Sequence, residues 1–197
     1  MTSDVRHDDE GNPLSYSDSE KRRLEREAAR LFMRAYEQQF HQPMRHIWHN
    51  EPAKPDISCY LAGAPLDLEI AHLYANEREA RIASGDQPGS KHHEHYHGDE
   101  HLWAYLAELA SMDSSRKLHT SLGHILNSKA RKHYNSSRCW LVIRNASPLW
   151  GHKDFLQVIP HLTVPASPFE KIWVLADFRG TGPLLQLGGA TDTQLHK

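Results

Sequence analysis

The sequence predicts a single α/β domain with a mixed central β-sheet flanked by helices. Two near-continuous apolar runs, at 139–145 and 171–177, are typical of strands that are buried on both faces. A helical segment expected at 153–162 lies between them and completes a strand–helix–strand unit. The 197 residues, 39% of them hydrophobic, suffice for one domain with its own core. An edge strand is expected at 184–187.

The N-terminal part predicts a tail followed by a long helix. Residues 1–18 are polar and nearly free of large apolar side chains, which predicts disorder, so the domain is expected to span 19–197. A helix should begin near Ser17 or Ser19 and run towards Phe40. Its apolar stripe consists of Leu24, Ala28, Leu31, Phe32 and Ala35. Glu25 lies at the edge of this stripe and Glu27 on the opposite flank.

Residues 54–73 predict a β-hairpin, which a short strand at 46–50 precedes. Apolar and polar residues alternate on both sides of a turn at 62–65. A loop of two or four residues centred on Gly63 and Ala64 would pair Ser58 with Glu69. A three-residue loop would instead put the polar residues of the two strands on opposite faces.

Two carboxylates of this hairpin form the candidate site. With an even loop, Asp56 and Glu69 share one face as diagonal neighbours, roughly 7–8 Å apart. That separation allows a cation to bind between them. As alternatives, Asp56 after Pro55 can simply terminate a turn, and Glu69 can be a solvent-facing strand residue.

A lysine interrupts the apolar face of a helix expected at 117–134. With Leu118 as the origin, Lys129 falls at about 20° on the helical wheel. That direction is the middle of the stripe formed by Leu118, Leu122, Ile125 and Leu126. Because an unpaired buried ammonium is costly, Lys129 must either extend to solvent near the helix end or meet an anionic partner.

Composition favours a cytoplasmic protein. The formal net charge of −2 gives no global attraction to nucleic acid or membrane. Cys59 and Cys139 lie in strand-like runs and suggest no disulfide framework, and no signal peptide or membrane-spanning run is present. The sequence also lacks a nucleophile elbow and a phosphate-binding glycine loop, which disfavours acyl-transfer and P-loop chemistry.

A polar loop or insertion is expected at about 75–101, and a short amphipathic helix at 102–109 follows it. The run from Lys91 to His101 is rich in histidine and suggests zinc. It lacks the paired ligand spacing of a structural zinc finger, so adventitious or no metal binding is favoured. His72, near Glu69, is interpreted as a structural strand-end histidine.

The order of these elements resembles the PD-(D/E)XK phosphodiesterase superfamily, which includes restriction enzymes, Holliday-junction resolvases and prophage-type nucleases. The resemblance covers residues 20–178. Its specific matches are Pro55-Asp56 and Leu68-Glu69-Ile70, and its softer matches are the segments 24–28 and 125–129.

This resemblance implies a restriction-endonuclease-like core and a Mg²⁺-dependent (or Mn²⁺-dependent) endonuclease. Asp56 and Glu69 would bind the metal, and Glu25 or Glu27 of the first helix would assist, with Glu25 preferred. A lysine would orient or deprotonate the attacking water. DNA is the expected partner, a homodimer is left open, and no membrane association is expected.

One departure leaves three interpretations open. The family's lysine lies two residues after the second acid, where this chain has Ala71. Lys129 can place its ammonium in the same space from the following helix. Alternatively, Asp67 and Glu69 form the motif, with Glu69 in the lysine's place. In the third interpretation the chain is an inactive, binding-only relative with the histidine-rich loop as its partner surface.

Basic residues cluster at 21–23 and between Lys129 and Arg138. Near the candidate site they can contact backbone phosphates. The alternative is an ordinary solvated helix face.

Overall fold

The computed structural model describes residues 16–50, 54–75 and 113–188, which form one mixed sheet with helices on both faces. The six strands lie in chain order across the sheet. Pairing is antiparallel except for β3–β4 and β4–β5, which are parallel. The predicted α/β class is therefore confirmed. The strands are β1 (Met44–His49), β2 (Ile57–Leu61), β3 (Ala64–Leu73), β4 (Cys139–Asn145), β5 (Lys171–Leu175) and β6 (Leu184–Gly188).

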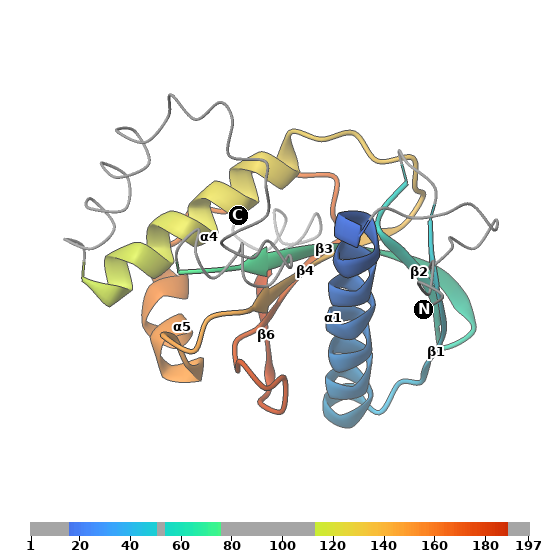
Figure 1. The fold of residues 1–197 in the computed structure, drawn as a ribbon, viewed down its shortest axis with the longest axis horizontal. Coiled ribbons are helices and arrows are strands. Elements are labelled where there is room, and N and C mark those ends of the chain that lie inside the picture. The colour runs from blue at the N-terminus through green and yellow to red at the C-terminus, as the bar shows by residue number, and fades with distance from the viewer. Residues whose placement is uncertain (1–15, 51–53, 76–112, 189–197) are drawn as a thin grey trace, which may run out of the picture.

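The sheet divides the core into two layers, and helices cover both. Helix α1 (Tyr16–Phe40) covers one face, where Phe32 packs among the indoles of Trp140 and Trp173. Helices α4 (Ser114–Ala130) and α5 (His152–Val158) cover the other face, and the short 3-10 helix η1 (Ile159–His161) follows α5. Figure 1 shows α1 alongside β1 and β2, away from α4 and α5. Among the described residues, no helix combines the length and apolar character needed to cross a membrane.

Element boundaries differ from the predicted ones mainly at helix ends. The strand at 139–145 has the predicted bounds, whereas β5 ends at Leu175, two residues early. Helix α4 begins earlier than expected because Asp113 caps it, its side chain accepting a hydrogen bond from Arg116 N at 2.9 Å. It also ends at Ala130 instead of Tyr134.

The hairpin between β2 and β3 turns one residue earlier than predicted. The loop consists of Ala62 and Gly63, with φ of 47° and 84°, and Leu61 pairs with Ala64. Positive φ at both loop residues matches the twist of a two-residue hairpin, and glycine at the second position accepts it without strain. Ser58 consequently pairs with Asp67, so the predicted pairing with Glu69 is wrong. Because the loop is even, the predicted sharing of faces is unchanged.

Several predictions fall outside the described residues. These are most of the N-terminal tail, the polar loop from residue 76 onwards with its histidine-rich run and zinc question, and the helix at 102–109. Residues 16–18 of the expected tail belong to α1. The first strand, expected at 46–50, begins earlier at Met44 and ends at His49.

Candidate functional site

Asp56 and Glu69 lie together where β2 meets β3. The β2–β3 ladder ends at the pair Ile57–Leu68, and its continuation by one residue puts Asp56 directly opposite Glu69, so the predicted diagonal arrangement is wrong. The Asp56 carboxylate is tied to β3, because its Oδ2 accepts a hydrogen bond from Ile70 N at 2.9 Å. Within the described residues, Oδ1 has no hydrogen-bond partner. Asp56 thus combines a turn contact with an oxygen that can bind a ligand.

Asn50 holds the Pro55–Asp56 segment in place. Its Nδ2 donates to Pro55 O at 2.8 Å, and its backbone N–H donates to Asp56 O at 3.1 Å. Asn50 Oδ1 in turn lies 2.9 Å from Ser58 Oγ, whose single O–H it shares with Asp67 Oδ1. These bonds fix the peptide that carries the Asp56 side chain, so its carboxylate is pre-positioned.

Lys129 reaches this pair from α4. Its Nζ lies 2.5 Å from Glu69 Oε1 and 3.2 Å from Ile70 O. The apolar stripe of α4 is almost completely buried against the sheet, which directs Lys129 inward; its members are Leu118, Leu122 and Leu126. Of the two alternatives for Lys129, the structure therefore shows the anionic partner. Ala71, two residues after Glu69, is buried on the same side of β3.

Glu25 of α1 belongs to the same electrostatic site. Its side chain is buried, 3.6 Å from Lys21 Nζ and 3.7 Å from His49 Nε2. Burial raises the pKa of Glu25 to about 7, the charge of Asp56 adds to the rise, and Lys21 opposes it. The other helix acid, Glu27, is half-exposed and pairs with Arg144 at 3.0 Å. Of the two helix acids, Glu25 is thus the buried one, and the charge of Asp56 acts on it.

Asp56 and Glu69 repel each other electrostatically within this site. Burial raises the pKa of Glu69, the charge of Asp56 adds to the rise, and Lys129 and then Lys132 oppose it. The described ranges hold no ready-made group of three or more His, Cys, Asp or Glu side chains arranged as a metal site. The donor chemistry nevertheless fits Mg²⁺, which prefers carboxylate oxygens and would relieve this mutual repulsion.

Asp67 has a different environment from Asp56. Its Oδ1 accepts from Ser58 Oγ at 2.5 Å, and its Oδ2 accepts from Ser136 Oγ at 2.6 Å. Both carboxylate oxygens are thus used to join β2 to the segment before β4. This geometry favours Asp56 over Asp67 as the partner of Glu69.

His72 lies on the other face of the sheet from Glu69. Residues 66, 68 and 70 of β3 face α1, and His72 continues that face. The His72 ring stacks on Tyr74 with centroids 6.1 Å apart, and burial lowers the pKa of His72 to about 4. A neutral, stacked imidazole fits the structural role predicted for it.

Two side chains near the site were not predicted. His49 Nε2 lies 3.0 Å from Arg22 O, between α1 and β1, besides its contact with Glu25. Tyr134 Oη donates to Lys129 O at 3.4 Å, and burial, with the charge of Glu69, raises the pKa of Tyr134. The contact of His49 joins two elements that are distant in sequence. Tyr134 lies beyond the end of α4. Local periodicity therefore predicts neither contact.

No family model, curated protein or solved structure matches this chain.

The raised pKa of Glu25 predicts that the stability of the fold depends on pH near neutrality. Because its pKa is higher in the folded chain than its ordinary value near 4.5, the folded state binds more protons between about pH 4.5 and 7. The stabilisation is fully present below this window and is lost as the pH rises through 7. We expect Glu25→Gln to gain about 2 kcal/mol in free energy of unfolding over wild type between pH 5 and 8.

Urea denaturation of wild type and Glu25→Gln at pH 5 and at pH 8 measures this gain. Glu27→Gln is the matched control on the exposed flank of the same helix and should show no such gain. Equal pH slopes for wild type and Glu25→Gln would contradict the buried, proton-binding role of Glu25.

Proposed function

We propose that this protein is a metal-dependent phosphodiesterase that cleaves DNA, with a PD-(D/E)XK-type site whose lysine comes from α4. The observation that carries the proposal is the Lys129–Glu69 contact at 2.5 Å, beside Asp56. An ammonium from another element lies next to the second acid of the motif, where Ala71 cannot supply one. The chain order of a helix acid, Pro-Asp, Glu and a cation supports the same assignment.

The carboxylates of Asp56 and Glu69 would hold the metal ion, as Mg²⁺ or Mn²⁺. When bound, such an ion polarises a phosphate oxygen and lowers the pKa of a water molecule. Asp56 is suited to this role because its peptide is fixed by Asn50 and its carboxylate by Ile70 N. Glu69 is suited because its strand is central and paired on both sides.

Lys129 and Glu25 would handle charge and protons. The Lys129 ammonium can donate to a phosphate oxygen as negative charge develops there. Glu25, with a pKa of about 7, can accept or release a proton near neutral pH. Glu25 is buried and Lys129 is half-buried, so solvent screens their charges less than it screens those of exposed groups.

Two observations favour a second candidate, a binding module without catalysis. Lys129 already neutralises Glu69, and the described residues present no preassembled metal cluster. In this alternative the ion pair only joins α4 to β3. Metal binding separates the two functions without any assumption about the substrate.

We expect calorimetry to detect Mn²⁺ binding that vanishes in Asp56→Ala/Glu69→Ala. All variants should carry serine in place of the histidines between 92 and 101, since imidazoles bind divalent metals. Asp67→Asn is the matched control, an acid on the same strand whose oxygens are used by Ser58 and Ser136. Equal heats in the wild type and the double variant would contradict the metal site and favour the binding module.

A further inference from the structure

A β-bulge in β1 changes the direction of its side chains. Between the pairs Arg45–Tyr60 and Trp48–Ser58, two residues of β1 stand opposite Cys59 alone. Regular alternation would put Trp48 on the same face as Met44, in the core under α1. With the bulge, Ile47 packs against that core, and Trp48 shares the opposite face with Ser58 and Tyr60.

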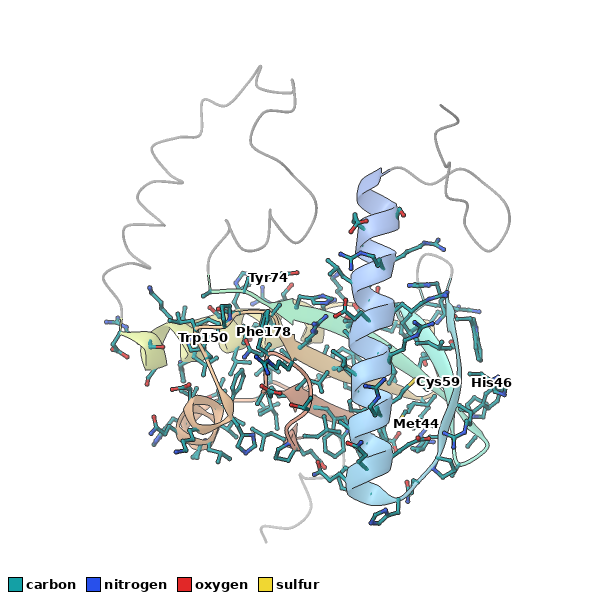
Figure 2. The ribbon with its side chains drawn as sticks, turned by 60° about the horizontal axis from the view of Figure 1, so that its bottom comes forward. Met44, His46, Cys59, Tyr74, Trp150 and Phe178 are labelled. Carbon is teal, nitrogen blue, oxygen red and sulfur yellow. The ribbon has the colours of Figure 1, made fainter. Side chains whose placement is uncertain are left out.

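This bulge is maintained at a conformational cost. His46 adopts φ of 56°, a left-handed conformation that costs a non-glycine residue about 1 kcal/mol. Figure 2 shows His46 at the outer rim of the β1–β2 ribbon and Met44 beside α1. Local strain of this kind often accompanies function, so the surface that it creates is a candidate binding site.

The surface created is an aromatic pair open to solvent. The rings of Trp48 and Tyr60 have centroids 5.7 Å apart, and the His46 ring meets Tyr60 edge-on at 5.9 Å. Trp48 is 38% and Tyr60 36% exposed. Mutual contact fixes the two large rings while each keeps accessible area. We call Trp48 and Tyr60 the aromatic pair.

The aromatic pair continues the face of the sheet that carries the candidate site. Asp56, Ser58 and Tyr60 alternate along the same side of the chain, and Tyr60 follows Asp56 by four residues, about 13 Å. Exposed cations lie near the carboxylates. Lys54 precedes Asp56 by two residues, and the charge of exposed Lys132 acts on Glu69.

We propose that the aromatic pair stacks unpaired bases of single-stranded DNA whose backbone passes the Asp56–Glu69 site. This inference rests on the proposed function and adds the strandedness of the substrate. Every base offers a π-face to an aromatic side chain, whereas duplex bases are already stacked on each other. The nearby cations complement the phosphates. A stable complex with a protein partner would bury about 800 Å² of accessible surface on this protein, far more than two half-exposed rings supply.

The test measures binding of the full-length protein in EDTA, which separates it from cleavage. Fluorescence anisotropy compares a labelled oligothymidine with a blunt duplex. We expect Trp48→Ala and Tyr60→Ala each to weaken oligothymidine binding by roughly 5- to 100-fold. Trp48→Phe, which keeps a ring, should retain most of the affinity. Phe178→Ala is the matched control, because Phe178 is 43% exposed and lies across α1 from His46 in Figure 2.

The outcomes distinguish this inference from the proposed function. Wild-type affinity in Trp48→Ala/Tyr60→Ala overturns the inference, even if the protein cleaves DNA. Failure of the wild type to bind oligothymidine, or tighter binding to duplex, also overturns it. Binding that depends on the aromatic pair in a protein that never cleaves supports it and overturns only the nuclease. A dimer that dissociates in the double variant, by light scattering, overturns it in favour of self-association.

Discussion

We expect Glu69→Gln to reduce DNA cleavage by about 10³-fold or more while leaving the fold intact. The substitution keeps the shape of the side chain and an oxygen for Lys129, but it removes the charge that a metal ion needs. Losing several kcal/mol of charge stabilisation corresponds to this factor, since about 1.4 kcal/mol is tenfold in rate. Asp56→Asn should reduce cleavage similarly, because it removes the other carboxylate charge. It should also leave the fold intact, because the amide oxygen can still accept the hydrogen bond from Ile70 N.

Cleavage of a mixture of single- and double-stranded DNA in Mg²⁺ and Mn²⁺ measures the loss. The fold is checked by the unfolding temperature, which should fall by less than about 5 °C. Asp67→Asn serves as the control for the competing pair of acids. Full activity in Glu69→Gln would refute the assignment, and a loss in Asp67→Asn with full activity in Asp56→Asn would favour the motif formed by Asp67 and Glu69.

The second large effect concerns the origin of the ammonium. We expect Lys129→Ala to reduce cleavage by about 10²-fold or more, as loss of a single preorganised donor does. Adding Ala71→Lys should recover at least about tenfold of that loss. Residue 71 lies two positions after Glu69 on the same side of β3, and removal of the Lys129 side chain leaves it space.

Stability complicates Lys129→Ala, because the buried Glu69 carboxylate loses its half-buried partner, at a cost of up to about 3–5 kcal/mol. Lys129→Gln, which can still donate to Glu69, is therefore measured in parallel. Lys132→Ala removes a neighbouring exposed lysine and should change cleavage less than either. If Lys129→Gln cleaves as wild type does, Lys129 only joins α4 to β3.

Patterns within one element predicted much of this site. Alternation placed Asp56 and Glu69 on a shared face, and helical periodicity turned Lys129 inward, since both depend on residues close in sequence. The bounds of β4 followed from its apolar run, because both faces of that strand are covered. The apolar stripe of α1 likewise located Glu25 at its edge, although the proximity of Glu25 to Asp56 appears only in the fold.

Features that depend on backbone φ or on distant contacts were not predictable. The turn shifted by one residue because Ala62 adopts positive φ, which alanine does not signal. No sequence pattern indicates the bulge at His46 either, so the exposure of Trp48 beside Tyr60 was not predicted. His49 contacts α1 across 27 positions, which no local period reveals.

In the Lys129–Glu69 contact, the position of a charged group depends on the packing of apolar side chains. A lysine on β3 would be held by strand hydrogen bonds, whereas Lys129 is placed by the leucines that hold α4 on the sheet. Deleting one residue of α4 between Leu126 and Lys129 would rotate the ammonium by about 100° around the helix axis. Detachment of α4 would withdraw the ammonium from Glu69. The position of the cation beside Glu69 is therefore only as stable as the interface between α4 and the sheet.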